Sequence, residues 1–325
     1  MASPASESPL AAKVRAALKL REPLEKESTA YRLINGESDG LDGLRAERYE
    51  AFVVLSVFTD EMDAAASEVA ELLVGLGYAG VYLKRRVRVD LRRVDVSDLA
   101  PGRPIAGVEA PTPLVISENG LRMKVLMNDG MATGLYVDQR NNRALLRGDC
   151  DGARVLNLFS YTGAFTVAAG LGGARETVSI DLSRRTLERS RENVVLNGLE
   201  PKEHKHYAED ALKWTGRAVR KEQRFDWIVL DPPSFATRGR QVFTIARGYP
   251  QMAERALRLL EPGGRLLAVT NHTKTDLLAF ESLLQEVADK AGRSVADVVR
   301  LGAPLDCRAR PGVPEPVKSM LVTAT

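Results

Sequence analysis

From residue 151 onward, short apolar runs alternate with helical patterns. The apolar runs are VLNLF, VSIDL, FDWIVLD and RLLAVT, and the helical pattern LSRRTLERSRENVVLNG ends on a glycine suited to a helix C-terminus. Repeated strand–helix units predict a parallel sheet with helices on both faces. In such a sheet, ligands bind at the carboxyl ends of the strands. The pattern therefore predicts an α/β fold whose chemistry lies where the strands end.

The first half of the chain has a mixed pattern. Helical spacing at residues 10–26 and 61–76 flanks a β-prone region at 31–60. Residues 81–96 alternate apolar and charged side chains, which predicts a strand or hairpin with one solvated face. In residues 114–127 the letters ENG separate two β-prone runs and predict a hairpin. Together these elements predict a smaller N-terminal α+β domain.

Composition narrows the classes of protein. The 325 residues include 46 Lys and Arg against 43 Asp and Glu, and this net charge of +3 does not by itself predict nucleic-acid binding. Two cysteines exclude a disulfide scaffold and a cysteine-ligated zinc site, and with only three histidines we expect no metal. No apolar run approaches roughly 20 residues and MASPASESPL has no targeting pattern, so we expect a cytoplasmic protein with no membrane partner.

Polar residues follow three of the predicted strands. The first strand ends in Asn157 to Gly163, a polar turn whose glycine lets the backbone approach a nucleoside; an ordinary strand–helix loop is the alternative. Asp181, about twenty residues further on, is placed to accept hydrogen bonds from ribose hydroxyls. Asp210 is placed to read an adenine amino group. For both carboxylates the alternative is a helix cap.

The fourth strand ends in DPPSF, residues 231–235, the most specific motif in the chain. Two consecutive prolines hold the backbone extended and remove two N–H donors, so the neighbouring carbonyl groups stay free to accept hydrogen bonds from a ligand. Phe235 adds a face on which a planar base can stack. The alternative is a stiff loop after a buried strand, but that alternative leaves Asp231 unexplained.

Residues 157–165, Asp181, DPPSF and LEPGGRLLAVT, in that order and spacing, resemble the class I S-adenosylmethionine-dependent methyltransferases. The stretch GLYVDQRNNR, residues 134–143, narrows the resemblance to the bacterial 23S ribosomal RNA methyltransferases that modify cytosine C5. The similarity runs from about Tyr31 to the C-terminus, and the N-terminal PUA domain of that family is not recognisable. The resemblance implies a Rossmann-like sheet, S-adenosyl-L-methionine as cofactor and a ribosomal RNA substrate.

The resemblance also implies roles for individual residues. Residues of the DQR segment and of the first strand–helix turn would line the methyl-donor pocket: Asp138, Gln139, Arg140, Asn157, Phe159, Tyr161 and Gly163. The carboxylate that binds the ribose hydroxyls of the cofactor maps to Asp181, and the carboxylate beside its adenine maps to Asp210. Asp231, Pro232 and Pro233 would lie beside the transferred methyl group. Because methyl transfer is an in-line displacement, these residues would mainly position the reactants and exclude water.

One departure from the family changes the predicted chemistry. Cytosine-C5 enzymes attack C6 with a cysteine thiolate, and the resemblance places that cysteine after the fifth strand, where this chain reads VTNHT. Cys150 lies ahead of the first strand, and Cys307 would reach the site only if the C-terminal loop folded back. Asn271 offers an amide to a base edge. We therefore predict methylation of a ring or exocyclic nitrogen of a nucleobase, with Asp231, Pro232 and Asn271 as catalytic residues.

Three alternatives stay open. The scaffold could methylate a small heteroaromatic or natural-product molecule, it could use a relocated cysteine for cytosine C5, or it could bind S-adenosylmethionine or RNA without turnover. His272 could orient or deprotonate the acceptor, or it could be an ordinary exposed loop histidine.

The predicted organisation has four parts: an N-terminal helix or flexible segment at 1–29, an α+β domain for RNA or substrate at 30–112, a hairpin and connection at 113–150, and the methyltransferase domain at 151–325. The second part contains a run of six basic residues and one acidic residue at 84–93. On a straight strand Lys84, Arg86 and Arg88 share one side, where they would contact phosphate groups; a solvated strand face is the alternative. We expect ribosomal RNA or a ribosomal subunit as partner, with a small molecule as the alternative, and the resemblance also suggests a homodimer.

Overall fold

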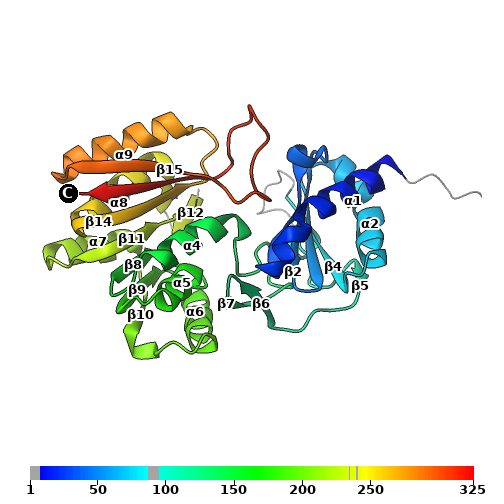
Figure 1. The fold of residues 1–325 in the computed structure, drawn as a ribbon, viewed down its shortest axis with the longest axis horizontal. Coiled ribbons are helices and arrows are strands. Elements are labelled where there is room, and N and C mark those ends of the chain that lie inside the picture. Colours follow the sequence, from blue (N-terminus) through cyan, green and yellow to red (C-terminus); the bar gives the residue numbers. More distant parts are fainter. Residues whose placement is uncertain (1–7, 87–94, 234, 239–240) are drawn as a thin grey trace, which may run out of the picture. The chain divides into compact units, whose positions relative to one another are not determined.

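The computed structural model describes residues 8–86, 95–233, 235–238 and 241–325, with the backbone alone for residues 96, 235–238 and 241–247. The chain forms two compact units (Figure 1). Unit 1 contains Met1–Asp138 and Pro304–Val313, and unit 2 contains Gln139–Ala303 and Pro314–Thr325. These borders differ from the expected ones at 112 and 150, because the hairpin region stays with unit 1 and a C-terminal segment returns to that unit.

Unit 1 is built on a five-stranded sheet with the strand order β1-β2-β3-β4-β5. Neighbouring strands are antiparallel except β3 and β4, which are parallel. Side chains from helices α1 and α2 join one continuous apolar core with the strands. The elements of unit 1 are α1 (Pro9–Arg21), η1 (Glu22–Lys26), β1 (Ala30–Asn35), η2 (Gly36–Asp39), β2 (Leu44–Tyr49), β3 (Phe52–Val57), α2 (Asp60–Gly75), β4 (Gly80–Arg85), α3 (Val96–Leu99), β5 (Ala106–Gly107), β6 (Leu114–Glu118) and β7 (Leu121–Val125), followed by η3 (Val137–Gln139) at the border.

The predicted hairpin is confirmed as β6 and β7. Glu118 pairs with Leu121, so Asn119 and Gly120 form a two-residue turn. Both turn residues have positive φ angles, 48° and 80°. This is the backbone that a tight hairpin with right-handed strand twist requires, and it explains why Asn-Gly is found there.

The second face of the unit 1 sheet, opposite its apolar core, is largely covered, and β4 is buried on both sides, contrary to the expectation that residues 81–96 have one solvated face. Arg32 lies opposite Glu47 across β1 and β2, and Lys84 lies opposite Ser56 across β3 and β4. Residues from distant parts of unit 1 cover this face: the Arg32 N–H donates to the Asp306 carboxylate at 2.8 Å, and the Lys84 ammonium donates to a carbonyl oxygen in the segment after β7. Of the six residues of β4, five are buried.

Unit 2 is built on a seven-stranded sheet with the strand order β10-β9-β8-β11-β14-β16-β15. The first five strands are parallel, while β16 is antiparallel to both of its neighbours. The elements of unit 2 are α4 (Arg140–Gly148), β8 (Arg154–Leu158), α5 (Ala164–Leu171), β9 (Glu176–Asp181), α6 (Arg184–Leu196), η4 (Pro201–Glu203), β10 (His204–Ala208), α7 (Ala211–Arg220), β11 (Phe225–Leu230), β12 (Phe235–Arg238), β13 (Gln241–Thr244), α8 (Ile245–Arg258), β14 (Leu260–Thr270), α9 (Leu277–Ala291), β15 (Val295–Leu301) and β16 (Lys318–Ala324).

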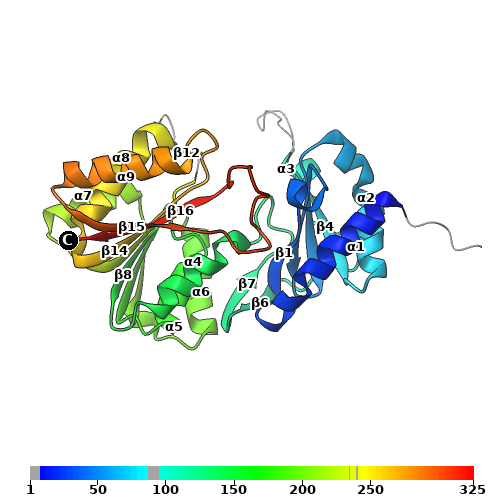
Figure 2. The same cartoon turned by 45° about the horizontal axis from the view of Figure 1, so that its top comes forward.

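Both faces of this sheet are covered by helices (Figure 2). Val155 and Val229 point into the core formed with α4 and α5, while Leu156 and Ile228 point into the core formed with α7, α8 and α9. Successive strand residues therefore serve opposite faces, as the apolar runs in the sequence require. The predicted α/β architecture with a parallel sheet is confirmed. No helix among the residues described is both long and apolar enough to cross a bilayer.

Candidate active site

The parallel strands of unit 2 end at one edge of the sheet, and the strand order reverses between β8 and β11. On one side of this point lie β9 and β10, and on the other lies β14. Open α/β sheets bind their ligands at such a reversal point. The predicted residues of unit 2 lie on or directly after these strands, apart from Gln139 and Arg140 at the start of α4.

The turn after β8 has an uncommon backbone. Phe159, Tyr161 and Gly163 have φ angles of 59°, 49° and 79°. For a non-glycine residue such a conformation costs on the order of 1–3 kcal/mol, and it is found mostly at functional sites. A Cβ atom on Gly163 would lie 1.9 Å from Ser190 Oγ, so close packing of α6 also requires glycine here. Direct contact of Phe159, Tyr161 or Gly163 with a nucleoside stays a prediction.

Asp181 ends β9, and its carboxylate connects two turns. Oδ2 accepts a hydrogen bond from the Tyr161 N–H and Oδ1 accepts one from the Ser183 N–H, both at 2.9 Å. The residue that caps α6 is Ser183, whose hydroxyl accepts from the Thr186 N–H at 3.2 Å. Asp181 is therefore not the cap itself. Oδ1 also accepts a hydrogen bond from the Thr186 hydroxyl at 3.4 Å. Oδ2 keeps a further acceptor site, so a charged acceptor remains at the edge of the sheet.

Three predicted donor-pocket residues are buried and support the edge from within. Asn157 donates from Nδ2 to Thr166 Oγ1 at 3.0 Å, which ties β8 to α5. Gln139 accepts at Oε1 from Asn142 at 2.7 Å, and buried Arg140 begins α4. These contacts explain a structural role for Asn157 and Gln139, while direct contact of all three residues with a methyl donor stays a prediction.

Asp210 follows β10 and caps α7. Its Oδ1 accepts a hydrogen bond from the Lys213 N–H at 2.9 Å. The helix-cap interpretation of Asp210 is confirmed. Its role in reading an adenine amino group stays a prediction, since a carboxylate that caps a helix keeps a second oxygen for a ligand.

The ends of β11 and β14 bring the predicted catalytic residues together. Leu230 pairs with Ala268 in the parallel ladder, so Asp231 and Pro232 leave the sheet beside the segment that leads to Asn271. Asp231 is half-buried, Pro232 is buried and Asn271 is exposed. Phe235, predicted to stack on a base, begins β12.

His272 is half-buried and is oriented by its own loop. Its Nδ1 lies 2.8 Å from Thr275 Oγ1, and its backbone carbonyl accepts a hydrogen bond from the Lys318 ammonium at 2.8 Å. Its backbone N–H donates to Thr270 Oγ1 at 3.2 Å. His272 is thus a loop residue, as the alternative interpretation had it, but it is partly buried rather than exposed, and its role toward a substrate stays a prediction.

Comparison with known proteins decides the family. A family model described as S-adenosylmethionine-dependent methyltransferase matches residues 86–314. The chain belongs to this methyltransferase family. Its cofactor is therefore S-adenosylmethionine, and the predicted fold class is confirmed. In agreement, the crystal structure of SMU.776 complexed with SAH superposes with a TM-score of 0.86 at 29% identity, covering 99% of this chain and 83% of that one.

Relatives with established names are ribosomal RNA methyltransferases. The Ribosomal RNA large subunit methyltransferase I of Klebsiella pneumoniae (strain 342) is 36% identical over 268 residues, which cover 82% of this chain and 66% of the relative. The protein of the same name from Erwinia tasmaniensis is 36% identical over 283 residues, covering 86% and 69%. The methyltransferase thus spans about two thirds of the length of these relatives. Their names specify no methylated atom, so the narrower resemblance to cytosine-C5 enzymes is not confirmed.

The basic residues predicted to contact RNA phosphate groups, Lys84, Arg86 and Arg88, belong to unit 1, and the two that the structure describes differ in exposure. Lys84 is 1% exposed, and its ammonium donates to the Gly130 carbonyl, so the prediction that it lies on a solvated face is wrong. Burial, assisted by nearby Arg86, lowers the pKa of Lys84 to about 8. Arg86 is exposed and donates to the Met131 carbonyl. Arg88 falls outside the residues that the structure describes.

Asp138 lies at the end of unit 1, beside a buried arginine. The Arg32 guanidinium is 4.0 Å from Asp138 Oδ2, 3.0 Å from Glu47 Oε1 and 3.0 Å from Asn35 Oδ1. Burial acts against the charge of Arg32, but these carboxylates and buried Cys307 together raise its pKa above the ordinary value. Asp138 thus belongs to a buried network of charges, which sequence reasoning did not detect.

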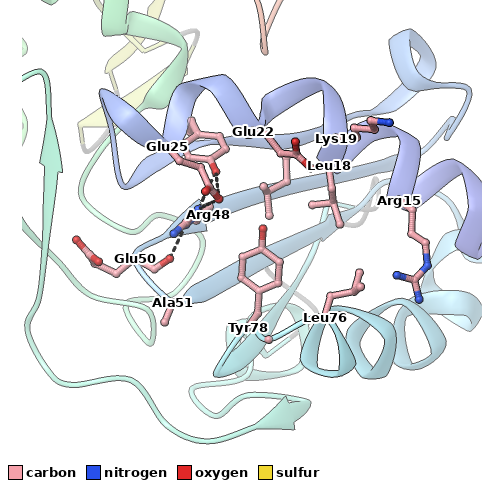
Figure 3. A pocket seen from close by; sticks show the side chains of 13 residues that line it. Arg15, Leu18, Lys19, Glu22, Glu25, Arg48, Glu50, Ala51, Leu76 and Tyr78 are labelled. Carbon is pink, nitrogen blue, oxygen red and sulfur yellow. Dashed lines mark hydrogen bonds and ion pairs between the residues drawn. The ribbon is translucent and has the colours of Figure 1, made fainter.

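A cavity of about 510 Å³ in unit 1 lies between η1, β2 and the end of α2 (Figure 3). Arg48 forms one wall: it donates to Glu25 Oε1 at 2.5 Å and to the Tyr31 hydroxyl at 2.8 Å. Its guanidinium also lies 6.0 Å from the ring centre of Tyr78. The cavity contains none of the predicted site residues, and Arg48 in its wall is paired. The location of the methyl-transfer site in unit 2 stays a prediction.

Proposed function

We propose that this methyltransferase modifies a nitrogen, ring or exocyclic, of a nucleobase in large-subunit ribosomal RNA. The observation that carries the proposal is the residue set beside Asp231: the segment that ends β14 presents Thr270, Asn271 and His272 and contains no thiol. A ring nitrogen with a lone pair needs no covalent activation, whereas cytosine C5 needs a thiolate added at C6. The names of the relatives support ribosomal RNA as the acceptor.

Neither cysteine of the chain is suited to act as a nucleophile. Cys150 is buried with its Sγ 3.4 Å from the Ala169 carbonyl oxygen, and burial raises the pKa of this thiol to about 11. Cys307 is buried in unit 1, and burial raises the pKa of its thiol well above the usual value even though Arg32 acts in the opposite direction. Since the thiolate is the reactive form, both groups are unreactive near neutral pH.

The edge of the sheet fits the cofactor. The Asp181 carboxylate is anchored by two backbone N–H groups and the Thr186 hydroxyl, and its Oδ2 keeps an acceptor site for a ribose hydroxyl. In the neighbouring turn the buried Ser160 hydroxyl has no hydrogen-bond partner among the residues described. S-adenosylmethionine, when bound, supplies a methyl group on a positively charged sulfur. The task of Asp231, Pro232 and Asn271 is to hold the acceptor base, to orient its lone pair and to exclude water.

A methylation assay with labelled S-adenosylmethionine tests the proposal. The acceptors are purified large-subunit ribosomal RNA, intact ribosomal subunits and a pool of small heteroaromatic molecules, and the product base is identified by mass spectrometry. We expect label in ribosomal RNA as an N-methylated base. If 5-methylcytosine is found instead, the nitrogen proposal is wrong; if label enters the small-molecule pool alone, the RNA proposal is wrong.

A cysteine-free variant provides the matched control. We expect the protein with Cys150→Ala and Cys307→Ser to retain its turnover within about threefold, since a nitrogen acceptor requires no thiolate. RNA that contains 5-fluorocytidine should form no covalent adduct with either protein. Loss of turnover in the Cys307→Ser protein, together with an adduct in the parent protein, would establish a relocated cysteine.

A further inference from the structure

Helix α7 of unit 2 carries a stripe of basic side chains on its exposed side. Trp214 and Ala218 are buried and pack into the core of the unit, while Lys213, Arg217 and Arg220 are exposed. Spacings of four and three residues place the three cations on one side of the helix. The helix contains no acidic residue, so this stripe differs from the mixture of opposite charges that is typical of a solvated helix face.

A groove of about 460 Å³ lies between α7 and α8, which contact each other on one face of the sheet. Among the described residues that line it are four cations and one amide, and none is a carboxylate. The lining consists of Leu212, Lys213, Gly216, Arg217, Arg220, Gln251 and Arg255. Cationic side chains from two helices thus converge on one surface depression.

Two guanidinium groups approach each other at Gly216. Arg255 is half-buried, and its guanidinium donates a hydrogen bond to the Leu212 carbonyl, which fixes it against α7. A Cβ atom on Gly216 would lie 3.2 Å from Arg255 Nη1 and 3.9 Å from Arg220 Nη1, so both groups lie within 4 Å of one point above the glycine. Like charges at such a distance repel each other, and an anion between them would remove the repulsion. Guanidinium groups bind phosphate oxygens in a fork geometry.

Most of the donors in this groove are available to a ligand. Arg217 is paired with Glu209 outside the groove, with Nη2 2.5 Å from Oε2. The side chains of Lys213 and Arg220, in contrast, make no hydrogen bond or ion pair within the described part of the chain. Arg255 uses one N–H for the Leu212 carbonyl, and a guanidinium has five. Three cations can therefore donate to an anion without breaking an ion pair of the fold.

We propose that the groove between α7 and α8 binds the phosphate backbone of the RNA substrate. This inference rests on the proposed function, in which the acceptor is ribosomal RNA. Lys213 and Arg220 are seven residues apart, about 10 Å along the helix axis, whereas each strand of a duplex has one phosphate for roughly every 3 Å of its axis. The stripe therefore matches several phosphates of one strand better than a single phosphate ion.

The position of α7 indicates what this contact does. The helix begins directly after Asp210, where β10 ends at the carboxyl edge of the sheet, so Lys213 lies in the turn nearest to that edge. Arg220 lies at the opposite end of the helix. Because phosphate contacts fix the register of a nucleic acid without reading its bases, the groove holds the backbone that leads away from the reacting base.

The double variant Lys213→Gln, Arg220→Gln in the full chain tests the inference, because both side chains are exposed and unpaired in the fold. Binding of large-subunit ribosomal RNA, measured by fluorescence anisotropy from about 50 to 200 mM salt, should weaken at least tenfold at the lowest salt, and the dependence of log affinity on log salt should fall by about 1.4–1.8, the value for two lost phosphate contacts. We expect KM for ribosomal RNA to rise by a similar factor with kcat within about twofold, since the groove binds the ground state and the transition state alike. Thermal stability and affinity for SAH should be unchanged.

Lys202→Gln, Lys290→Gln is the matched control. It removes the same charge from two exposed lysines of unit 2 that do not line the groove, so it should bind RNA as the parent protein does. Equal RNA binding by the groove variant and the parent protein, or an equal loss in both double variants, overturns the inference. So does a groove variant that loses affinity for pyrophosphate and keeps its affinity for RNA, because the groove would then bind a small phosphorylated molecule.

Failure of the proposed function gives a different result. A parent protein that binds ribosomal RNA without methylating a nitrogen contradicts the proposed function, and the binding measurements then decide on the groove alone. A parent protein that does not bind ribosomal RNA contradicts both.

Discussion

The carboxyl edge of the unit 2 sheet and the second face of the unit 1 sheet both hold charged groups in packed surroundings, but the charges are used differently. At the edge, Asp181 binds two backbone N–H groups and the Thr186 hydroxyl, and no cation pairs with it in the part of the chain that the structure describes. On the second face, Arg32 is placed among Glu47 and Asp138, and its own N–H binds Asp306. The first arrangement leaves negative charge and acceptor capacity for a ligand. The second neutralises charge within the fold, so it serves stability.

This difference predicts that the two regions can be disabled separately. A variant of the buried network should lose stability and keep its affinity for the methyl donor. A variant of the sheet edge should lose donor affinity and keep most of its stability. The predictions that follow test this separation, from the largest expected effect to the smallest.

Arg32→Met should have the largest effect. Removing one member of a buried charge network leaves the others unpaired and costs about 3–5 kcal/mol of the free energy of unfolding. Urea unfolding, with hydrogen exchange to report on unit 1, measures this loss, and the affinity of the folded protein for SAH should stay within twofold. Arg103→Met is the control: Arg103 pairs with Glu109 at 3.3 Å on the surface, and its removal should leave stability unchanged. A loss below about 1 kcal/mol for Arg32→Met would show that the network is not a source of stability.

Asp181→Asn should have the next largest effect, and on binding rather than stability. The amide keeps the size of the carboxylate but loses its charge and one acceptor oxygen. Hydrogen bonds to a charged group contribute about 1.5–3 kcal/mol each, so affinity for SAH should fall about a hundredfold in calorimetric titrations. Asp210→Asn is the comparison, with a fall below tenfold expected if that carboxylate mainly caps α7. Unchanged affinity in the Asp181 variant would mean that the carboxylate serves the turns alone.

Part of the edge could be predicted because some of its contacts are local. Asp181 binds the N–H two residues further along, and Asp210 binds the N–H three residues further along. The bond from the Tyr161 N–H to Asp181 spans 20 residues and could not be predicted in this way. Strand periodicity and helix caps are also properties of short segments, so the order of strands and helices after residue 151 could be predicted. The burial of Lys84 could not be predicted. The alternation of apolar and charged residues shows which residues share a face of a strand, but it does not show whether that face is covered. The residues that cover it come from far along the chain: Gly130 lies 46 residues from Lys84, and Asp306 lies 274 residues from Arg32.

The smallest expected effect concerns Lys84 and the pH dependence of stability. Its pKa is lowered from the ordinary 10.5 to about 8 by burial, so between these values the unfolded chain binds more protons than the folded protein. The free energy of unfolding should therefore rise with pH across this interval, by about 1–3 kcal/mol at most, because one pKa unit corresponds to about 1.4 kcal/mol. Thermal denaturation from pH 7.5 to 10 measures the rise. Lys84→Met should remove it, since methionine carries no charge that burial can penalise.

The same variant separates a buried cation from an RNA-contacting one. Lys84→Met should bind large-subunit ribosomal RNA as the parent protein does, because the ammonium is occupied by the Gly130 carbonyl and is shielded from phosphate. Arg86→Ala should weaken RNA binding at low salt and reduce the dependence of log affinity on log salt by about 0.7–0.9, the value for one lost phosphate contact. If Lys84→Met weakens RNA binding as much as Arg86→Ala, the second face of the unit 1 sheet opens to RNA, and the separation between a ligand-binding edge and a purely structural face fails.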